Sequence, residues 1–173
     1  HRAYHTLQHL SECFEHLDWA RSNEIFQHAD LVEAALWYHD VIYQPAAKDN
    51  ERRSAEWAIR SLARSGVVDK DCELVHALIM ATRHDETPEG LTPQLVVDVD
   101  LSILGAESAR FDEYENQVRK EYKWVPWLVY KKKRRELLQK FLDKPHIFRL
   151  EMFRTEYEQR ARTNLNRSLA RLA

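Results

Sequence analysis

Apolar residues recur at steps of three and four along most of this 173-residue chain, and this spacing places them on one face of an α-helix. It predicts helices over most of the chain, near residues 7–17, 31–38, 50–66, 71–83, 93–104, 111–122, 126–142 and 151–173. The alternation typical of a strand is nowhere sustained, and residues 95–97 are the one β-leaning stretch. We therefore expect an all-α fold in a single domain over residues 1–173.

Glycine is scarce, with three residues that lie far apart in the sequence: Gly66, Gly90 and Gly105. A dinucleotide-binding fingerprint needs three glycines in one short stretch, and a P-loop needs the pattern GxxxxGK[ST]. Neither pattern occurs, so the sequence excludes both kinds of nucleotide site. We expect Gly105 to cap the C-terminal end of a helix and Asn50 to cap the start of another.

Charged residues make up 31% of the chain and hydrophobic residues 44%, with a net charge of −2. This balance favours a globular chain over a disordered one. The net charge gives no overall attraction to nucleic acid or to an anionic membrane, so we expect neither as a partner. No run of about eighteen apolar residues is present, as a membrane-spanning helix would need.

The two cysteines, Cys13 and Cys72, form neither a CxxC pair nor the spacing of a disulfide scaffold. Isolated thiols fit a reducing compartment, and we expect the cytoplasm. The chain begins with His1 and not with Met, so we expect the natural N-terminus to lie upstream.

Nine histidines occur, and two of them, His5 and His9, are four residues apart on a predicted helix. Both side chains should then point to one side. Imidazole is the commonest metal ligand, so the pair could present two nitrogens to one cavity. It could also be two polar residues on a partly exposed helix.

A His-Asp pair, His39-Asp40, follows an apolar run over residues 34–38 that should carry it into the interior. A buried charge needs a partner or a metal ion. The alternative is a capping aspartate beside a core histidine.

Two further carboxylates, Asp98 and Asp100, lie in an apolar segment where uncompensated charge is costly. On a helix they point about 200° apart. We therefore expect one to face a metal cavity and the other to face solvent or a cap. The alternative is an exposed edge and an N-cap.

Taken in order, these residues form a His…His-Asp…Asp set that resembles the HD superfamily of metal-dependent phosphohydrolases over most of the chain. Two downstream segments resemble a bacterial branch of predicted HD phosphohydrolases: Tyr122–Pro126 and Asn164–Leu165. The segments that carry the resemblance to the superfamily itself are Tyr4–Leu10, Ala35–Asp40, Asn50–Ala55, Ala81–His84 and Asp98–Gly105.

The resemblance implies an all-α, phosphodiesterase-like helical bundle and a divalent ion, Mn, Mg, Fe, Co or Ni. The ligands that it implies are His9, His39, Asp40 and Asp100. Asp100 is preferred over Asp98 because the last carboxylate of the family stands directly before a Leu-x-x-Leu stretch.

A second His-Asp pair occurs at His84-Asp85, but only His39-Asp40 follows an apolar helix. The segment around His5 is also similar to one in cyclic-nucleotide phosphodiesterases, which implies that His5 donates a proton to the leaving group. Three residues beyond Asp40 stands Tyr43, where some nucleotidase branches carry an acid.

The implied activity is hydrolysis of a phosphomonoester or phosphodiester in a small, nucleotide-like compound. A divalent cation polarises a phosphoryl oxygen and lowers the pKa of water toward neutrality. Glu51 could orient that water or favour the start of a helix. His84 could join a second metal, hold phosphate or cap a helix. The candidate phosphate anchors are Arg2, Lys48 and Arg134.

Two alternatives come from other functional classes. One is a non-catalytic HD domain that binds a nucleotide or metabolite as a sensor. The other is a basic-helix module that binds nucleic acid or protein through residues 131–135, although we expect this run to be a solvated helix face. The long C-terminal helix could pack against a second copy. We expect four tryptophans in the core: Trp37, Trp57, Trp124 and Trp127.

Overall fold

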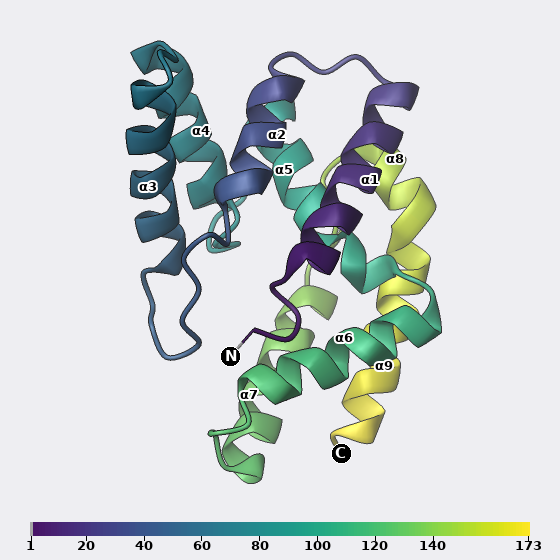
Figure 1. Ribbon diagram of the computed structural model, residues 1–173. Coiled ribbons are helices and arrows are strands. Elements are labelled where there is room, and N and C mark those ends of the chain that lie inside the picture. Colours follow the sequence, from purple (N-terminus) through teal and green to yellow (C-terminus); the bar gives the residue numbers. More distant parts are fainter. Residues whose placement is uncertain (1) are drawn as a thin grey trace. The chain divides into compact units, whose positions relative to one another are not determined.

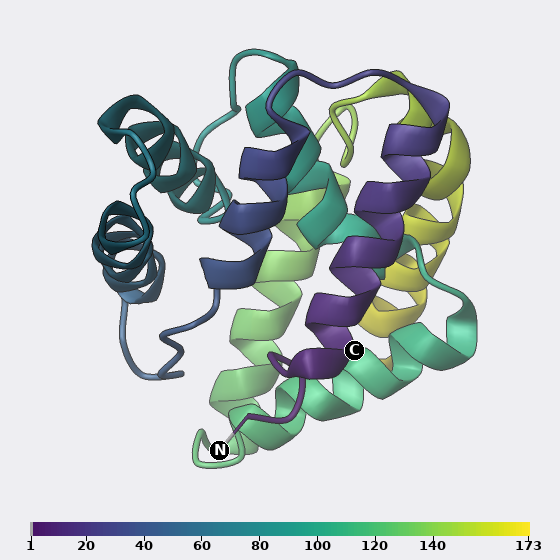
Figure 2. The same cartoon turned by 45° about the horizontal axis from the view of Figure 1, so that its top comes forward.

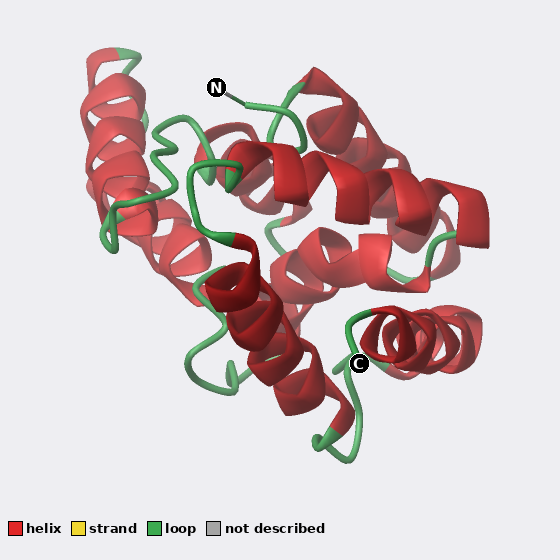
Figure 3. Cartoon of the chain, turned by 90° about the horizontal axis from the view of Figure 1, so that it is seen from below, coloured by secondary structure: helices red, strands yellow, loops and turns green. Residues whose placement is uncertain are grey.

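The computed structural model describes residues 2–173, and His1 lies outside the described residues. Over that range the chain consists of helices and the loops between them, with no strand (Figure 3). The all-α prediction is confirmed. The β-leaning residues 95–97 lie inside a helix, where all three side chains are buried, because burial in this setting outweighs their strand propensity.

The helices fall into two compact units. The N-terminal unit is His5–Asp100, and the C-terminal unit combines residues 2–4 with Leu101–Ala173. The expectation of a single domain stays a prediction.

In the N-terminal unit, α2 packs against α1, α3 and α4, and α3 lies alongside α4 (Figures 1 and 2). The helices of this unit are α1 (Leu7–Asn23), α2 (Ala29–Tyr38), α3 (Asn50–Arg64), α4 (Asp69–Ala81) and α5 (Leu91–Leu101). The boundaries lie within three residues of those that apolar periodicity predicts, except that α1 continues six residues beyond Leu17.

The loop between α2 and α3 is closed by side chains from the start of α3. The Asn50 amide donates to the Gln44 carbonyl and accepts from the Gln44 backbone N–H, both at 3.0 Å. The Ser54 hydroxyl lies 3.1 Å from the Ile42 backbone nitrogen and 3.2 Å from its carbonyl oxygen. Asn50 was predicted as a helix cap, but it is the first helical residue and its amide fixes the loop instead.

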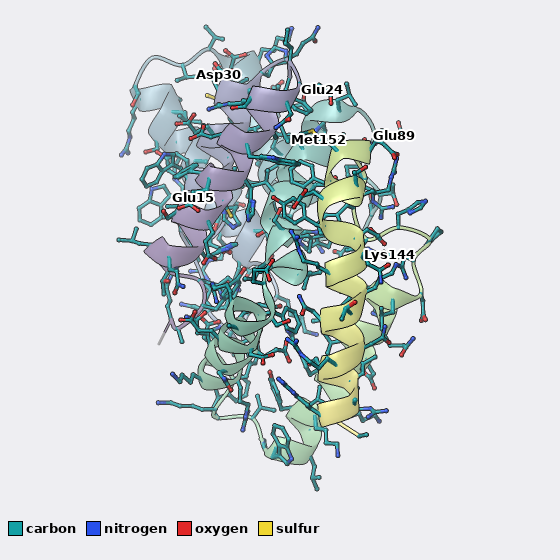
Figure 4. All side chains as sticks on the ribbon, turned by 90° about the vertical axis from the view of Figure 1, so that its right-hand side faces the viewer. Glu15, Glu24, Asp30, Glu89, Lys144 and Met152 are labelled. Atoms are coloured by element: carbon teal, nitrogen blue, oxygen red, sulfur yellow. The ribbon has the colours of Figure 1, made fainter. Side chains whose placement is uncertain are left out.

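The C-terminal unit contains η1 (Ser102–Gly105), α6 (Ser108–Glu121), α7 (Trp127–Leu142), α8 (Glu151–Phe153), η2 (Arg154–Glu158) and α9 (Gln159–Arg171). A π-helical turn, η2, joins α8 to α9, so the predicted long C-terminal helix is present with a bulge in it. Figure 4 shows Met152 on α8 and Lys144 beside this helix, where the Lys144 carbonyl accepts from Arg162 at 2.8 Å. α7 and η1 both pack on α9.

An ion pair between buried Arg134 and partly buried Glu115 lies within the C-terminal unit. The Arg134 guanidinium binds the Glu115 carboxylate and lies over the Tyr114 ring, 5.1 Å from its centroid. The Ser168 hydroxyl donates to the other Glu115 oxygen at 2.6 Å. These contacts tie α6, α7 and α9 together, because a buried charge is tolerated only when it is paired and hydrogen-bonded.

The four tryptophans predicted in the core are partly on the surface, and that prediction is wrong. Each exposes about half of its area or more: Trp37, Trp57, Trp124 and Trp127. Each lies off the buried face of its helix or in a turn, and indole tolerates such positions because it is amphipathic.

Among the described helices, none is both long enough and apolar enough to cross a membrane.

A glycine stands at position 105 because another segment of the chain passes very close to it. A Cβ atom on this residue would lie 2.6 Å from the Tyr157 Cβ and 2.9 Å from the Tyr157 carbonyl oxygen. Its φ is not positive, unlike that of Gly66 and Gly90. Gly105 was predicted to cap a helix, but it is the last residue of η1 and Ala106 is the cap. The residue at 105 is small because η2 crosses η1 there.

We expect Gly105→Ala to lower the free energy of unfolding by about 1–3 kcal/mol, because the new methyl group meets rigid backbone. Urea denaturation followed by circular dichroism measures the change. Gln159→Ala, at an exposed position of α9, is the control and should change stability by less than about 0.5 kcal/mol. A stability for Gly105→Ala equal to that of the control would contradict the close approach.

Candidate metal centre

The first histidine of the candidate site, His9, lies in the first turns of α1 and is buried. The Thr6 side chain caps this helix by accepting from the Gln8 backbone N–H at 3.3 Å. His5 stands in the turn before α1 and not on the helix as predicted. The two imidazole rings are 6.1 Å apart and nearly perpendicular.

The second histidine, His39, caps the C-terminal end of α2 and is also buried. Its Nδ1 lies 2.7 Å from the Leu36 carbonyl oxygen. A carbonyl accepts only, so Nδ1 carries the proton and donates. This bond fixes the ring and turns Nε2 toward Asp40 and Asp100, as the outer hydrogen bonds of metal-binding histidines do.

Four possible metal-ligand atoms come from three separate segments: His9 Nε2, His39 Nε2, Asp40 Oδ2 and Asp100 Oδ1. The two nitrogens are 3.3 Å apart. The His39 nitrogen lies 3.0 Å from Asp40 and 3.5 Å from Asp100. The His9 nitrogen lies 3.2 Å from Asp100 and 3.8 Å from Asp40.

Four of these five separations, from 3.0 to 3.5 Å, are close to the spacing of ligand atoms around a single ion. Ligand bonds of about 2.1 Å place neighbouring donors about 3.0 Å apart in an octahedron and about 3.4 Å apart in a tetrahedron. Two overlapping groups have donors close enough to hold an ion: His9 with His39 and Asp40, and His9 with Cys13 and Asp100. The first group, with two imidazoles and one carboxylate, has the kinds of ligand atom that bind a divalent cation. Asp100 lies beside it, 3.2 Å from His9 and 3.5 Å from His39.

The two carboxylates of the cluster and the neighbouring histidines shift one another's pKa values. Burial alone lowers the pKa of His39, but the Asp40 and Asp100 carboxylates outweigh it and raise that pKa well above its ordinary value. Burial alone raises the pKa of Asp40, but His39 lowers it well below the usual range. The pKa of Asp100 is lowered against its own burial by hydrogen bonds from His39, His84 and His9. The raised pKa of His39 and the lowered pKa values of Asp40 and Asp100 together favour a protonated imidazole beside two ionised, partly buried carboxylates.

His84 reaches the same carboxylate from the other side. Its Nε2 lies 3.0 Å from Asp100 Oδ2, while Oδ1 of that carboxylate faces His9 and His39. His84 has a φ of 57°, and positive φ is uncommon outside glycine. Its neighbour Asp85 pairs with Arg83 at 2.7 Å on the surface.

Asp98 departs from the expectation of a solvent-facing or capping carboxylate, because it is 0% exposed. Helix α5 is buried on nearly every side, with Leu95, Val96 and Val99 also inside. Asp98 lies about 200° around this helix from Asp100. Because the helix is buried on that side as well, the Asp98 side chain is enclosed by protein and does not reach solvent.

Cys13 belongs to the surroundings of the cluster, although the sequence analysis assigned it no part there. Its Sγ lies 3.7 Å from His9 Nδ1 and 3.8 Å from His9 Nε2, one helical turn along α1. Burial and the nearby Asp100 and Asp40 carboxylates raise the pKa of this thiol well above its usual value. The four-residue spacing of His9 and Cys13 places both on one face of a helix, and this could have indicated their contact from the sequence.

The other candidate residues are placed in different ways. The His5 ring stacks on buried Tyr43, with centroids 3.9 Å apart. Glu51 is partly buried in the first turn of α3, and Lys48 is exposed in the loop before it. Two candidate phosphate anchors belong to the C-terminal unit: partly buried Arg2 and Arg134, whose guanidinium is bound to Glu115.

Comparisons with protein-family models, curated proteins and solved structures find no match to this chain. What the site can do chemically therefore rests on its own residues and geometry.

We expect Asp100→Asn to destabilise the protein in the presence of a chelator by about 1–3 kcal/mol, because three imidazoles lose a charged acceptor. Urea denaturation in EDTA measures this change. The matched control, Asp85→Asn, removes an exposed carboxylate with one surface partner and should cost less than about 1 kcal/mol. Equal effects of the two substitutions would argue against a charge cluster centred on Asp100.

Proposed function

We propose that this chain is a metal-dependent phosphohydrolase of the HD type, acting on a phosphomonoester or phosphodiester of a small, nucleotide-like compound. One observation carries the proposal: the His9 and His39 Nε2 atoms lie 3.3 Å apart, and each lies within 3.8 Å of a carboxylate oxygen of Asp40 and of Asp100. These residues follow the His…His-Asp…Asp order of the HD resemblance.

The donor chemistry supports a divalent ion such as Mn, Mg, Fe, Co or Ni. Two carboxylates balance a 2+ charge. Mixed nitrogen and oxygen ligands are more typical of these ions than of zinc in a closed structural site. When bound, such an ion polarises a phosphoryl oxygen and acidifies water. His84 positions the Asp100 carboxylate from its far side, at 3.0 Å.

In the proposed reaction, water adds to phosphorus and the bond from phosphorus to the leaving oxygen breaks. The leaving oxygen needs a proton, and His5 is the group that we assign to donate it. Stacking on Tyr43 holds the plane of the His5 ring. His5 is also close enough to lower the pKa of Asp40 by its charge.

Phosphate anchoring and water orientation fall to residues of the loop between α2 and α3 and of the first turn of α3. Lys48 is exposed there, and Glu51 follows it at the start of α3. The Arg134 guanidinium is neutralised by Glu115, so the proposal gives it a smaller part than Lys48.

We infer a small phosphorylated substrate. The reaction requires neither nucleic acid nor a membrane. A second copy of the chain could pack against the C-terminal helix. Both cysteines, Cys13 and Cys72, are free and buried. This supports a reducing compartment such as the cytoplasm.

Metal binding should depend on the cluster. In protein stripped with EDTA, added Mn²⁺ at about 100 times its dissociation constant should stabilise the fold by about 2.7 kcal/mol, and phosphatase activity should return. His39→Ala and Asp40→Ala should lose both effects because each removes a donor. Thermal unfolding with and without Mn²⁺, together with phosphate release, measures them.

The control is His76→Ala, a partly buried histidine of α4, which should keep both effects. If His39→Ala and Asp40→Ala both retain full metal binding and full activity, the assignment of the ligands is wrong.

Proton donation by His5 should depend on the leaving group. We expect His5→Gln to lower kcat about 100-fold on alkyl phosphates, since general acid catalysis contributes about 10²–10⁴-fold. It should change kcat little on p-nitrophenyl phosphate, because that leaving group departs without a proton. Steady-state kinetics on both substrates measures the difference, with His146→Gln, an exposed histidine, as control. An equal loss on both substrates would contradict the role as acid.

A further inference from the structure

Four large apolar side chains are exposed together in the turn between α6 and α7 and in the first turn of α7. Trp124 is 61% exposed and Leu128 is 77% exposed, and Trp127 and Val129 each expose about half of their area. The connection and α7 can be followed in Figure 1. We call Lys123, Trp124, Trp127, Leu128, Val129 and Lys132 the α7 tip.

The α7 tip is held in shape by a residue of α6. The Arg119 guanidinium donates to the Tyr122 carbonyl at 2.7 Å and to the Val125 carbonyl at 3.2 Å. It also lies 5.6 Å from the Trp127 ring centroid and 4.7 Å from that of Tyr130. A rigid turn loses little conformational entropy on binding a partner, so the entropy cost of contact through these apolar groups is small.

The charge around the α7 tip is one-sided. Residues 119–135 contain eight of the 26 Lys and Arg residues of the chain and one acidic residue, Glu121. Glu121 is buried and accepts from the Ala3 and Tyr4 backbone N–H groups at 2.7 and 2.8 Å. Lys123 and Lys132 are exposed beside the apolar groups. The whole-chain charge of −2 therefore conceals a strongly basic end.

We propose that the α7 tip docks on an anionic lipid surface. Indole rings favour the boundary between headgroups and acyl chains, aliphatic side chains enter the apolar layer, and lysines pair with anionic headgroups. This mode needs no spanning helix, which agrees with the lack of one among the described helices. It differs from the expectation of no membrane partner, which was drawn from the net charge and from the lack of a long apolar run.

Charge and side-chain type favour lipid over the two other kinds of partner. A second copy in a two-fold arrangement would bring the same basic patch against itself, and like charges repel. Single-stranded nucleic acid would use the aromatic rings for base stacking. It would gain little from Leu128, the most exposed apolar residue of the tip at 77%, or from half-exposed Val129.

Co-sedimentation with vesicles tests the proposal on the whole chain. Vesicles of phosphatidylcholine with about 30% phosphatidylserine should bind the protein at least tenfold more tightly than phosphatidylcholine alone, since each lysine near the surface adds to the attraction. Added salt should weaken the binding, because it screens these charges.

Two pairs of variants locate the contact. Leu128→Ser should weaken binding to the anionic vesicles several-fold, while Leu7→Ser, at a leucine that is 78% exposed on α1, should leave it unchanged. Lys132→Glu should weaken it, and Lys70→Glu, at an exposed lysine of α4, should not. Circular dichroism of every variant checks that the fold is retained.

Three results would overturn the proposal. The first is equal binding of folded protein to anionic and neutral vesicles, or binding to neither. The second is binding to single-stranded RNA that Leu128→Ser leaves intact while the vesicles bind nothing. The third is a dimer in sedimentation that Leu128→Ser dissociates, since that would assign the α7 tip to a second copy of the chain.

Discussion

The Asp100 carboxylate is the point on which the N-terminal unit depends. One of its oxygens faces His9 and His39, and the other faces His84. These imidazoles come from the start of α1, the end of α2 and the residues after α4, so one partly buried carboxylate contacts residues at the ends of three helices. A carboxylate is tolerated at such a place only with matching positive charge, which protonated imidazole or a divalent cation can supply.

The same requirement explains the surroundings of the cluster. The Leu36 carbonyl holds the His39 ring, and His84 takes an uncommon backbone conformation in order to reach Asp100. Polar groups are costly to bury without partners, so the contacts of His39 with Leu36 and of His84 Nε2 with Asp100 constrain the backbone around the cluster. The geometry that would suit an ion is therefore already present in the fold of the chain.

Charge is distributed unevenly in the rest of the molecule. In the C-terminal unit, Arg134 is buried against Glu115, whereas Lys123 and Lys132 are exposed beside exposed tryptophans. A run of basic residues in the sequence therefore divides into a structural ion pair and a surface patch. Net charge, which averages over the chain, cannot separate these two uses, and the proposed lipid contact became visible only in the structure.

The sequence by itself determined the helices, because apolar spacing depends on local geometry, and it also determined the order of the histidines and aspartates. It placed Asn50 and Gly105 near helix ends but gave the wrong reasons, because their contacts with Gln44 and Tyr157 come from other segments. Only the tertiary structure decided that Asp98 is buried away from the cluster, that Cys13 lies against His9 and that Trp124 is exposed. Those outcomes depend on which helix faces pack together, and that choice is made by contacts between residues far apart in the chain.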